Sequence, residues 1–577
     1  MSPELDPGLD SWDGEKTTPL ARQAANIGEV PDLSQTDITN PKASSGHPAE
    51  AETAGRVSRW HGLSGLAVAL PIFPAIMLIT GLVMIGYMSP IYAGLQGLDY
   101  DPAYQYLFNG AGLMRGYNPA HIDHPGTPVQ ILSGLISIIS WSLARLCGLT
   151  TLPFPASIAA NSEEYLRVIM TAFLVMNCIA VYWVGAAIAR STGIAAAGIA
   201  CQTAYFLFGS LFPRIFNAAP EAILCLSATA LMAVLAPVLF ADEDCSDRRA
   251  VAAGFFIGLG VTSKVTFFPL LLLTLLLKRP RPIFIMLSAS ALYAFLFLLP
   301  IVDKLKHVFG WLFSIATHEG NHGDGAAGFI DWAVLPERAG LIASAEPLLV
   351  VAAIAAAAAI LTSNSGDRRK AAILAATLGT LILLVLKHYA IHYLMPAVAI
   401  APTIIVWAIS RLAERQRPYM LAGAIAAIVG GASVANMSAA FANERALRRE
   451  NEKAVNEVIA RYQNPVVIGA YRSGYKPWAI LFALSWSDLK FARLFPPTTA
   501  ADSMTYDSGL KKLWRAHSGP VDWNYLDQFE KAGRAVLIVQ SKDNKIEPQT
   551  ARTETLLDQG FGDTVERIIV SPKADDK

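Results

Sequence analysis

The sequence predicts a polytopic, all-α membrane protein with a soluble α/β domain at its C-terminal end. Of its 577 residues, 53% are hydrophobic and only 16% are charged, which is typical of a chain that crosses a membrane many times. Long apolar runs recur between residues 61 and 442, whereas residues 443–577 are polar. The formal net charge is zero, so no bulk attraction to nucleic acid is expected.

The first 60 residues are polar and are rich in Pro, Ser, Thr, Gly and acids. They lack a hydrophobic period, so residues 1–60 are predicted to be a disordered cytoplasmic tail. The first apolar run begins near Leu63, and no cleavable signal peptide is therefore predicted. None of the five cysteines forms a CxxC pair, which argues against a disulfide framework or a zinc site.

The transmembrane domain is predicted over residues 61–442, with about 10–13 membrane segments including half-helices. A spanning helix needs about 20 apolar residues. The clear candidates are 63–88, 168–189, 193–213, 222–241, 283–302, 347–362, 371–386, 389–410 and 418–442. Two segments are ambiguous, because 129–143 contains four serines and a tryptophan, and 250–277 has Lys264 at its middle.

The positions of the basic residues resolve both ambiguous segments. Short basic clusters occur at Arg190, Arg248–Arg249, Lys278–Arg281, Arg368–Lys370 and Arg411–Arg417. All of them fall on the cytoplasmic side if 129–143 does not cross and 250–277 is a pair of half-helices that turns at Lys264. Half-helices of that length stop short of the far surface. Lys264 is therefore predicted to lie below the outer surface, in a polar cavity.

The same topology gathers unusual polar chemistry on the outer side. It places a large first loop, 89–164, and a second loop, 303–337, outside, together with the seven histidines between residues 100 and 400. The inner side keeps only ordinary anchoring charges. This asymmetry indicates an outward-facing active site.

Residues 443–577 are predicted to form a small extracytoplasmic α/β domain. The stretch "NEKAVNEVIARY" has helical periodicity, and "PVVIGAY" and "RAVLIVQS" have the pattern of short buried strands. The stretch "ERIIV" is a possible third strand. The number of preceding membrane crossings places this domain outside.

Two aspartates in the first outer loop are the candidate catalytic residues. Asp101 begins "DPAYQYLFNG", which predicts an amphipathic helix with Tyr104 and Phe108 on one face. An aspartate at a helix start also suits the helix dipole, so capping is the alternative role. We assign Asp101 and Asp99 as catalytic candidates and Tyr104 as a substrate contact.

A histidine-rich turn follows in the same loop, "HIDHPGTP" from His121 to Pro128. Its side chains could orient a substrate or bind a metal, and Asp123 and His124 are assigned to substrate binding. No diagnostic metal-ligand spacing is present. A divalent cation, Mg²⁺ or Mn²⁺, is compatible with Asp99 and Asp101 but is not required.

Further candidates lie at predicted helix ends on the outer side. An ionisable residue inside an apolar stretch is a functional candidate by default, which singles out Lys264. Each of the others alone would be read as an interfacial anchor, but together they form a basic rim suited to a phosphate. The predicted phosphate-binding residues are Lys264, Arg214, His388 and His392, and Glu221 is assigned to substrate binding.

The glycine-rich stretch 317–331, "THEGNHGDGAAGFID", is predicted to be a mobile flap over the site. It contributes His318 and His322 as substrate-binding candidates. It lacks the GxxxxGK[ST] pattern of a phosphate-binding loop, so nucleotide binding is not supported.

Four short motifs together resemble the GT-C class of integral membrane glycosyltransferases, which includes protein O-mannosyltransferases and the enzymes that add aminoarabinose or galacturonate to lipid A and its core. They are "DPAYQY", "HPGTP", "GLGVTSK" and "HYLMPAVAI", in order over residues 63–412. The resemblance aligns Asp101 with the essential acid of that class and ends the third motif at Lys264. Two departures are Asp-Pro in place of Asp-Glu and His in place of Arg before "YLMP".

The resemblance implies a sugar donor carried on a polyprenyl phosphate and an acceptor that is a cell-envelope glycan, lipid or protein. Asp101 would be the general base, and basic residues would stabilise the departing phosphate. It also implies a multi-pass protein of the bacterial inner membrane with an extracytoplasmic site. Two alternatives are a transporter, for which the two halves show no internal repeat, and a non-enzymatic polysaccharide-assembly or scaffold protein.

Overall fold

The computed structural model describes most of the membrane domain and much of the C-terminal domain. The described residues are 68–88, 103–122, 126–207, 211–212, 214–319, 326–328, 332–412, 418–419, 421–423, 425–426, 429–431, 450, 453–469, 476–495, 504–507, 512–515, 519–541, 546, 552–558 and 563–569. The predicted tail 1–60 and five candidate site residues (Asp99, Asp101, Asp123, His124 and His322) lie outside them.

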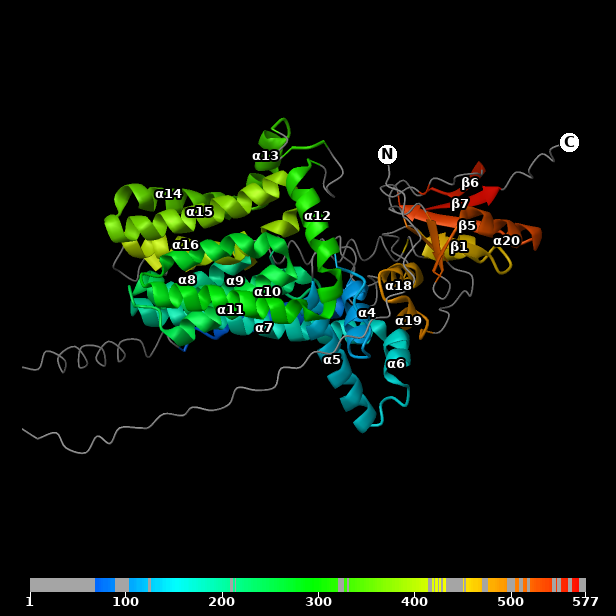
Figure 1. The fold of residues 1–577 in the computed structure, drawn as a ribbon, viewed down its shortest axis with the longest axis horizontal. Coiled ribbons are helices and arrows are strands. Elements are labelled where there is room, and N and C mark those ends of the chain that lie inside the picture. The colour runs from blue at the N-terminus through cyan, green and yellow to red at the C-terminus, as the bar shows by residue number, and fades with distance from the viewer. Residues whose placement is uncertain are drawn as a thin grey trace, which may run out of the picture. The chain divides into compact units, whose positions relative to one another are not determined.

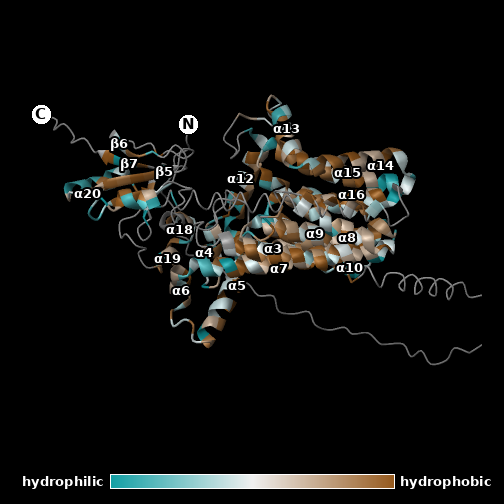
Figure 2. Ribbon diagram, turned by 180° about the vertical axis from the view of Figure 1, so that it is seen from behind, coloured by the Kyte–Doolittle hydropathy of each residue, from teal (hydrophilic) through white to brown (hydrophobic). Residues whose placement is uncertain are grey.

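The membrane domain is a bundle of apolar helices (Figure 1). Its main helices are α3 Ile72–Met88, α7 Ser162–Thr192, α8 Ala195–Ala204, α9 Pro220–Phe240, α10 Asp247–Ser263, α11 Pro280–Leu298, α14 Pro347–Thr362, α15 Ser365–Lys387 and α16 Met395–Leu412. Within the described part, six helical segments are long and apolar enough to cross a membrane, and three shorter apolar helices accompany them. Figure 2 shows hydrophobic residues along much of this bundle. The predicted polytopic all-α class is confirmed.

The predicted break at Lys264 is present. Helix α10 ends at Ser263, and Lys264 has extended dihedral angles, φ −160° and ψ 135°. The next segment is a 3-10 helix, η3 Val265–Leu276, where an α-helical half was expected. Pro269 lies inside this segment, and proline lacks the N–H that an α-helix would use there.

The chain turns back at this break, as the charge pattern predicts. A Cβ on Gly254 would meet Met286 and Ala289, and one on Gly258 would meet Ser290 and Ala294. Later residues of α10 therefore contact later residues of α11, which means that the two helices run in the same direction. The segment η3, which connects them, must run in the opposite direction. The ring of Phe267 in η3 packs over Gly260, where a Cβ would lie 2.4 Å from a ring carbon.

The basic clusters that follow α9 gather at one end of the bundle. Ion pairs join Arg281 to Asp247 at 2.7 Å and Lys370 to Asp242, also at 2.7 Å. Further pairs at this end are Arg279–Asp244, Lys278–Asp242 and Arg411–Asp367. Helix α10 begins at this charged end and finishes at Lys264, so the charged end and the break are separated by the length of α10. This is the arrangement that the basic clusters predict.

The first outer loop folds into three helices, α4 Ala103–Leu113, α5 Thr127–Leu146 and α6 Phe154–Ala160. Ten consecutive residues of α4, Ala103–Gly112, are buried, so the prediction of an amphipathic helix was wrong. The reason is tertiary. Helix α5 packs directly on α4, where a Cβ on Gly110 would lie 2.4 Å from the Gln130 carbonyl oxygen. The C-terminal domain covers α4 as well: Phe108 meets Phe495 edge to face, and Asn109 donates to the Trp486 carbonyl at 3.0 Å.

Helix α5 covers the ambiguous segment 129–143 and forms one continuous helix. Its length and composition would permit a membrane crossing, yet it lies oblique to the bundle helices α7 and α11 in Figure 1. Only its first half is buried. A position outside the membrane core therefore stays the prediction for α5.

The second predicted outer loop, 303–337, is also partly helical. A 3-10 turn, η4 Leu299–Lys304, leads into α12 Leu305–Thr317. Helix α13 Leu335–Ala345 begins near the end of the predicted loop. Apolar residues of η4 and α12 bury Ile122 of the first outer loop. Lys304 donates to the Pro119 carbonyl, so the two outer segments meet here.

The C-terminal domain is a mixed seven-stranded sheet with the strand order β4-β3-β2-β1-β5-β7-β6. Its strands are β1 Val466–Gly469, β2 Met504–Asp507, β3 Lys512–Arg515, β4 Gly519–Val521, β5 Val536–Ser541, β6 Arg552–Leu557 and β7 Asp563–Ile569. The three predicted strands correspond to β1, β5 and β7. Strand β1 pairs in parallel with β2 and β5, and α18 Lys476–Ser485 and α19 Leu489–Ala492 follow β1.

Candidate functional site

A buried ion pair lies at the break in α10. The ammonium of Lys264 is 2.8 Å from a carboxylate oxygen of Glu221, and each side chain is 1% exposed. Glu221 lies in the first turn of α9, directly after Pro220, where a carboxylate suits the helix dipole. A buried ammonium needs an anionic partner, and here a residue 43 positions earlier in the chain provides it.

Aromatic residues complete the surroundings of this pair. The Lys264 ammonium lies 4.5 Å from the centre of the Tyr393 ring, which is within the range of a cation–π contact. Tyr393 belongs to a 3-10 turn, η5 Ile391–Leu394, that also carries the buried His392. The structure thus pairs two predicted site residues, Lys264 and Glu221, and places a third, His392, against the Tyr393 ring at a centroid distance of 4.4 Å.

Glu221 has further bonding capacity. Its second oxygen is buried and has no hydrogen-bond partner among the described residues. A buried acceptor without a donor costs free energy, so this oxygen is suited to receive a donor from a ligand. Arg214 is 9% exposed and lies in the short segment that leads into α9.

His388 and His318 each contact a backbone carbonyl near the C-terminal end of α12. The Nε2 atom of His388 is 3.2 Å from the Ile315 carbonyl oxygen, and Lys387 donates to the Ala316 carbonyl. His318 caps the same helix, with its Nδ1 atom 3.1 Å from the Ser314 carbonyl oxygen. The ammonium of Lys387 is favourable at a helix C-terminus. In this structure His388 contacts the end of α12, and its role in phosphate binding stays a prediction.

Tyr104 lies inside the protein. It is fully buried in α4, its ring stacks on Phe108, and its hydroxyl donates to Glu163 in the first turn of α7. These contacts join the first outer loop to the bundle. A contact between Tyr104 and substrate stays a prediction.

A polar network that the sequence reasoning missed lies next to the candidate loop. The side-chain nitrogen of Gln130 donates to the His121 carbonyl at 2.7 Å, and His121 Nε2 lies 3.3 Å from the Tyr106 hydroxyl. Both Gln130 and His121 are buried. His121 was recognised only as one member of the histidine-rich turn, and Gln130 lay within a segment that looked apolar.

The candidate catalytic acids belong to the loop that leads into this network. Helix α4 begins at Ala103, directly after the undescribed residues around Asp101. In the sequence, the undescribed residues 123–125 lie between the His121 segment and α5. The catalytic assignments therefore stay predictions. Among the described residues, no group of three metal-ligating side chains is present, and a metal at Asp99 and Asp101 is untested.

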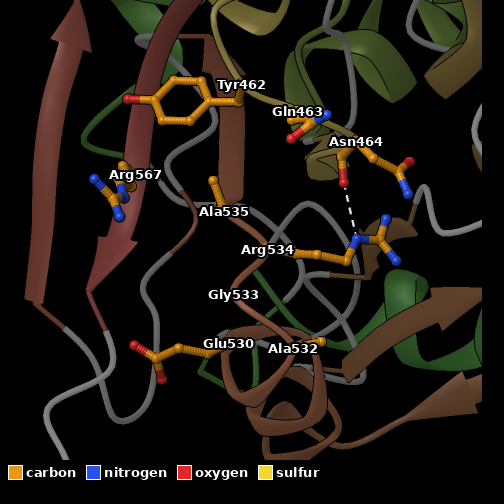
Figure 3. Close-up of a pocket in the computed structure, with 9 residues that line it drawn as sticks. All are labelled: Tyr462, Gln463, Asn464, Glu530, Ala532, Gly533, Arg534, Ala535 and Arg567. Atoms are coloured by element: carbon orange, nitrogen blue, oxygen red, sulfur yellow. Dashed lines mark hydrogen bonds between the residues drawn. The ribbon is translucent and has the colours of Figure 1, made fainter.

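A cavity of about 530 Å³ lies in the C-terminal domain (Figure 3). It opens beside the beginnings of β1 and β5. Arg567 lies over the Tyr462 ring at 5.8 Å, and Arg534 donates to the Asn464 carbonyl at 2.8 Å. Its polar lining side chains are mostly exposed, and it lacks the buried charges that mark the Lys264 site.

Comparison with known proteins identifies the fold. No family model matches the chain, and no curated protein matches it. Among solved structures, the chain is similar to ArnT from Cupriavidus metallidurans bound to undecaprenyl phosphate, with a TM-score of 0.51 and 10% sequence identity. The match covers 87% of this chain and 99% of that one. The chain thus has an ArnT-like GT-C fold, as the sequence motifs predict.

Proposed function

We propose that the protein is a glycosyltransferase that moves a sugar from a polyprenyl-phosphate donor to an acceptor outside the inner membrane. The observation that carries the proposal is the buried Lys264–Glu221 pair at the break in α10, within the fold of a protein whose structure holds undecaprenyl phosphate. An intramembrane lysine at a helix break is suited to a lipid-linked phosphate.

The roles follow from the chemistry of glycosyl transfer. Asp101, or Asp99 beside it, accepts the proton of the acceptor hydroxyl. The acceptor oxygen then forms a bond to the anomeric carbon while the bond from that carbon to the phosphate oxygen breaks. The electron pair leaves on the phosphate, and Lys264, Arg214 and His392 stabilise the charge that develops there. The products are the glycosylated acceptor and polyprenyl phosphate.

The direct test supplies purified protein with synthetic undecaprenyl-phosphate sugars and a cell-envelope acceptor fraction. Mass spectrometry would measure the release of undecaprenyl phosphate and the mass gained by the acceptor. Wild-type protein is expected to turn over at least one donor, and Asp101→Asn is expected to abolish turnover without changing thermal stability.

Two outcomes would contradict these roles. An active Asp101→Asn protein would remove Asp101 as the base and move the test to Asp99→Asn. A deletion strain with unchanged envelope glycans and no accumulated polyprenyl-phosphate sugar would argue against the transferase itself, and in favour of a transport or assembly role.

A further inference from the structure

Asn177 is a buried amide in the middle of α7, and its side chain is 3% exposed. Its nitrogen donates to the Ile215 carbonyl at 2.8 Å and to the Ala222 carbonyl at 3.1 Å. A third contact, to the Phe173 carbonyl at 3.0 Å, lies within α7 itself. Because an amide nitrogen carries two hydrogens, the three carbonyls share them. Asn177 therefore links α7 to two points on the chain that leads into α9.

The segment that Asn177 holds has an irregular backbone. Residues 215–219 form neither helix nor strand, and all of them are buried. Carbonyl groups buried in such a segment need donors from other parts of the protein. Asn177 supplies one donor to Ile215, at the beginning of the segment, and reaches Ala222 in the first turn of α9. One side chain thus ties both ends of the segment to α7.

A predicted site residue stands next to each of these two contact points. Arg214 directly precedes Ile215, and Glu221 directly precedes Ala222. Arg214 is 9% exposed, and Glu221 pairs with Lys264 at 2.8 Å. The Asn177 contacts therefore hold the backbone beside Arg214 in a fixed position relative to the backbone beside Glu221.

We infer that Asn177 is a positioning residue for the donor phosphate. It acts through Arg214, which it holds in register with the Lys264–Glu221 pair so that both cations can bind one phosphate group. Charge-assisted hydrogen bonds depend on distance and direction, and a small displacement of a binding group lowers the contribution that it makes. The inference rests on the proposed function and names a residue on which the phosphate site of that function depends.

Asn109 in α4 provides a matched control. It is 2% exposed, and its nitrogen donates to the Gln105 carbonyl four residues earlier, at 2.8 Å, and to the distant Trp486 carbonyl at 3.0 Å. Its oxygen also accepts from the Ala120 N–H at 2.8 Å. Loss of this amide should therefore cost at least as much stability as loss of the amide at Asn177. Neither carbonyl partner of Asn109 adjoins a predicted phosphate-binding residue.

The test measures the affinity of purified full-length protein in detergent for undecaprenyl phosphate. Asn177→Leu removes the amide with little change in volume and should weaken binding about tenfold or more. Asn109→Leu should bind as the wild type does, although its melting temperature falls at least as far. The second variant is Asn177→Ser, for the case that leucine prevents folding. A helical serine can bond the carbonyl four residues earlier, which leaves Ile215 and Ala222 without this donor, so the same loss of affinity is expected.

A double-mutant cycle tests whether Asn177 acts through Arg214. Arg214→Ala alone should weaken binding of undecaprenyl phosphate. Adding Asn177→Leu to Arg214→Ala should then change the affinity by less than about threefold, because the group that Asn177 positions is already absent. A purely structural role for Asn177 would give the same loss in both backgrounds.

The possible failures are distinguishable. The inference is overturned if the Asn177 variants bind undecaprenyl phosphate as tightly as the wild type, or if Asn109→Leu loses as much affinity as Asn177→Leu. Losses that simply add in the double-mutant cycle would also overturn it. Failure of the wild-type protein itself to bind undecaprenyl phosphate would instead refute the proposed function on which the inference rests.

Discussion

The Lys264 ammonium lies 2.8 Å from the Glu221 carboxylate, and both side chains are 1% exposed. Two charges removed from water attract one another strongly, but each also loses its hydration. Such a pair is therefore weak evidence for stability in itself. Its position at a helix break suggests that it is retained for the chemistry of the site.

Removing one partner should cost more stability than removing both. Lys264→Met or Glu221→Gln alone would leave a buried group without its partner, and we expect a loss of about 3–5 kcal/mol for the uncompensated charge. The double variant Lys264→Met/Glu221→Gln should regain much of the lost stability and remain inactive. Thermal unfolding in detergent and the transfer assay would measure both effects. Equal stability of the single and double variants would show that the two residues do not act as a pair.

Lys264 should also determine affinity for the donor phosphate. Lys264→Ala is expected to weaken binding of undecaprenyl phosphate strongly, and Lys264→Arg to restore it only in part, because a planar guanidinium replaces a compact charge. Binding would be measured on variants that remain folded. Unchanged affinity in the alanine variant would remove Lys264 from the phosphate site.

The topology gives a separate prediction, which is tested in a background without the native cysteines because Cys147 is exposed. A Lys306→Cys variant in intact cells or oriented vesicles should react with a small, membrane-impermeant thiol reagent added from outside, because Lys306 is exposed and lies in the segment predicted to be outside. Arg281→Cys is the control, because this residue lies at the opposite, charged end of the bundle and its side chain is 79% exposed. It should react only from the cytoplasmic side. The reverse pattern would overturn the assigned sides of the membrane.

The close approach of α10 and α11 predicts a sensitive glycine. A Cβ on Gly258 would lie 2.9 Å from the backbone of Ser290 and Ala294, so Gly258→Ala must push the helices apart. Overpacking of this kind costs about 1–3 kcal/mol. Gly379→Ala is the control, because that glycine lies within α15 with nothing within 4 Å of its built Cβ. A control as destabilising as Gly258→Ala would contradict the packing argument.

Asp242 at the charged end should contribute stability that depends on pH. Partial burial acts to raise the pKa of this carboxyl, but the hydrogen bond and charge of Lys370 outweigh it and lower the pKa below its ordinary value of 3.8. The contribution is therefore present above about pH 3.8 and is lost as the pH falls through the lower folded value.

The melting temperatures of the wild type and of Asp242→Asn would be compared as a function of pH. Asparagine is chosen because it tolerates the left-handed backbone conformation of this position, φ 55°. The wild-type advantage in melting temperature should be small, because the side chain is 53% exposed. It should be visible at pH 7 and vanish below the folded pKa. An advantage that persists at pH 2 would show that ionisation is not its cause.

The sequence by itself determined the class of the protein, the positions of most of the apolar helices that the structure describes and the reversal of the chain at Lys264, whereas the predicted span 418–442 lies largely outside the described residues. Hydrophobic runs and basic clusters are local features of the sequence. An apolar run in a membrane must form a helix to satisfy its backbone hydrogen bonds, and the basic clusters predict which helix ends face the cytoplasm. The strands β1, β5 and β7 were likewise visible as apolar runs. The four other strands are no shorter as a group, but their apolar residues are interrupted by polar residues or by Gly and Pro, so that none shows an apolar run.

Only the tertiary structure decided which residues meet. Glu221 and Lys264 are 43 positions apart, and no periodicity links them. Their pairing depends on how α9 and α10 pack. In the same way, the sequence pattern of α4 predicts one exposed face, but α5 and the C-terminal domain cover it. The buried polar residues of α5, such as Gln130, lie in a segment whose sequence reads as apolar. Periodicity records which face of an element is apolar, whereas the partner of a buried polar group is set by packing between elements distant in the chain.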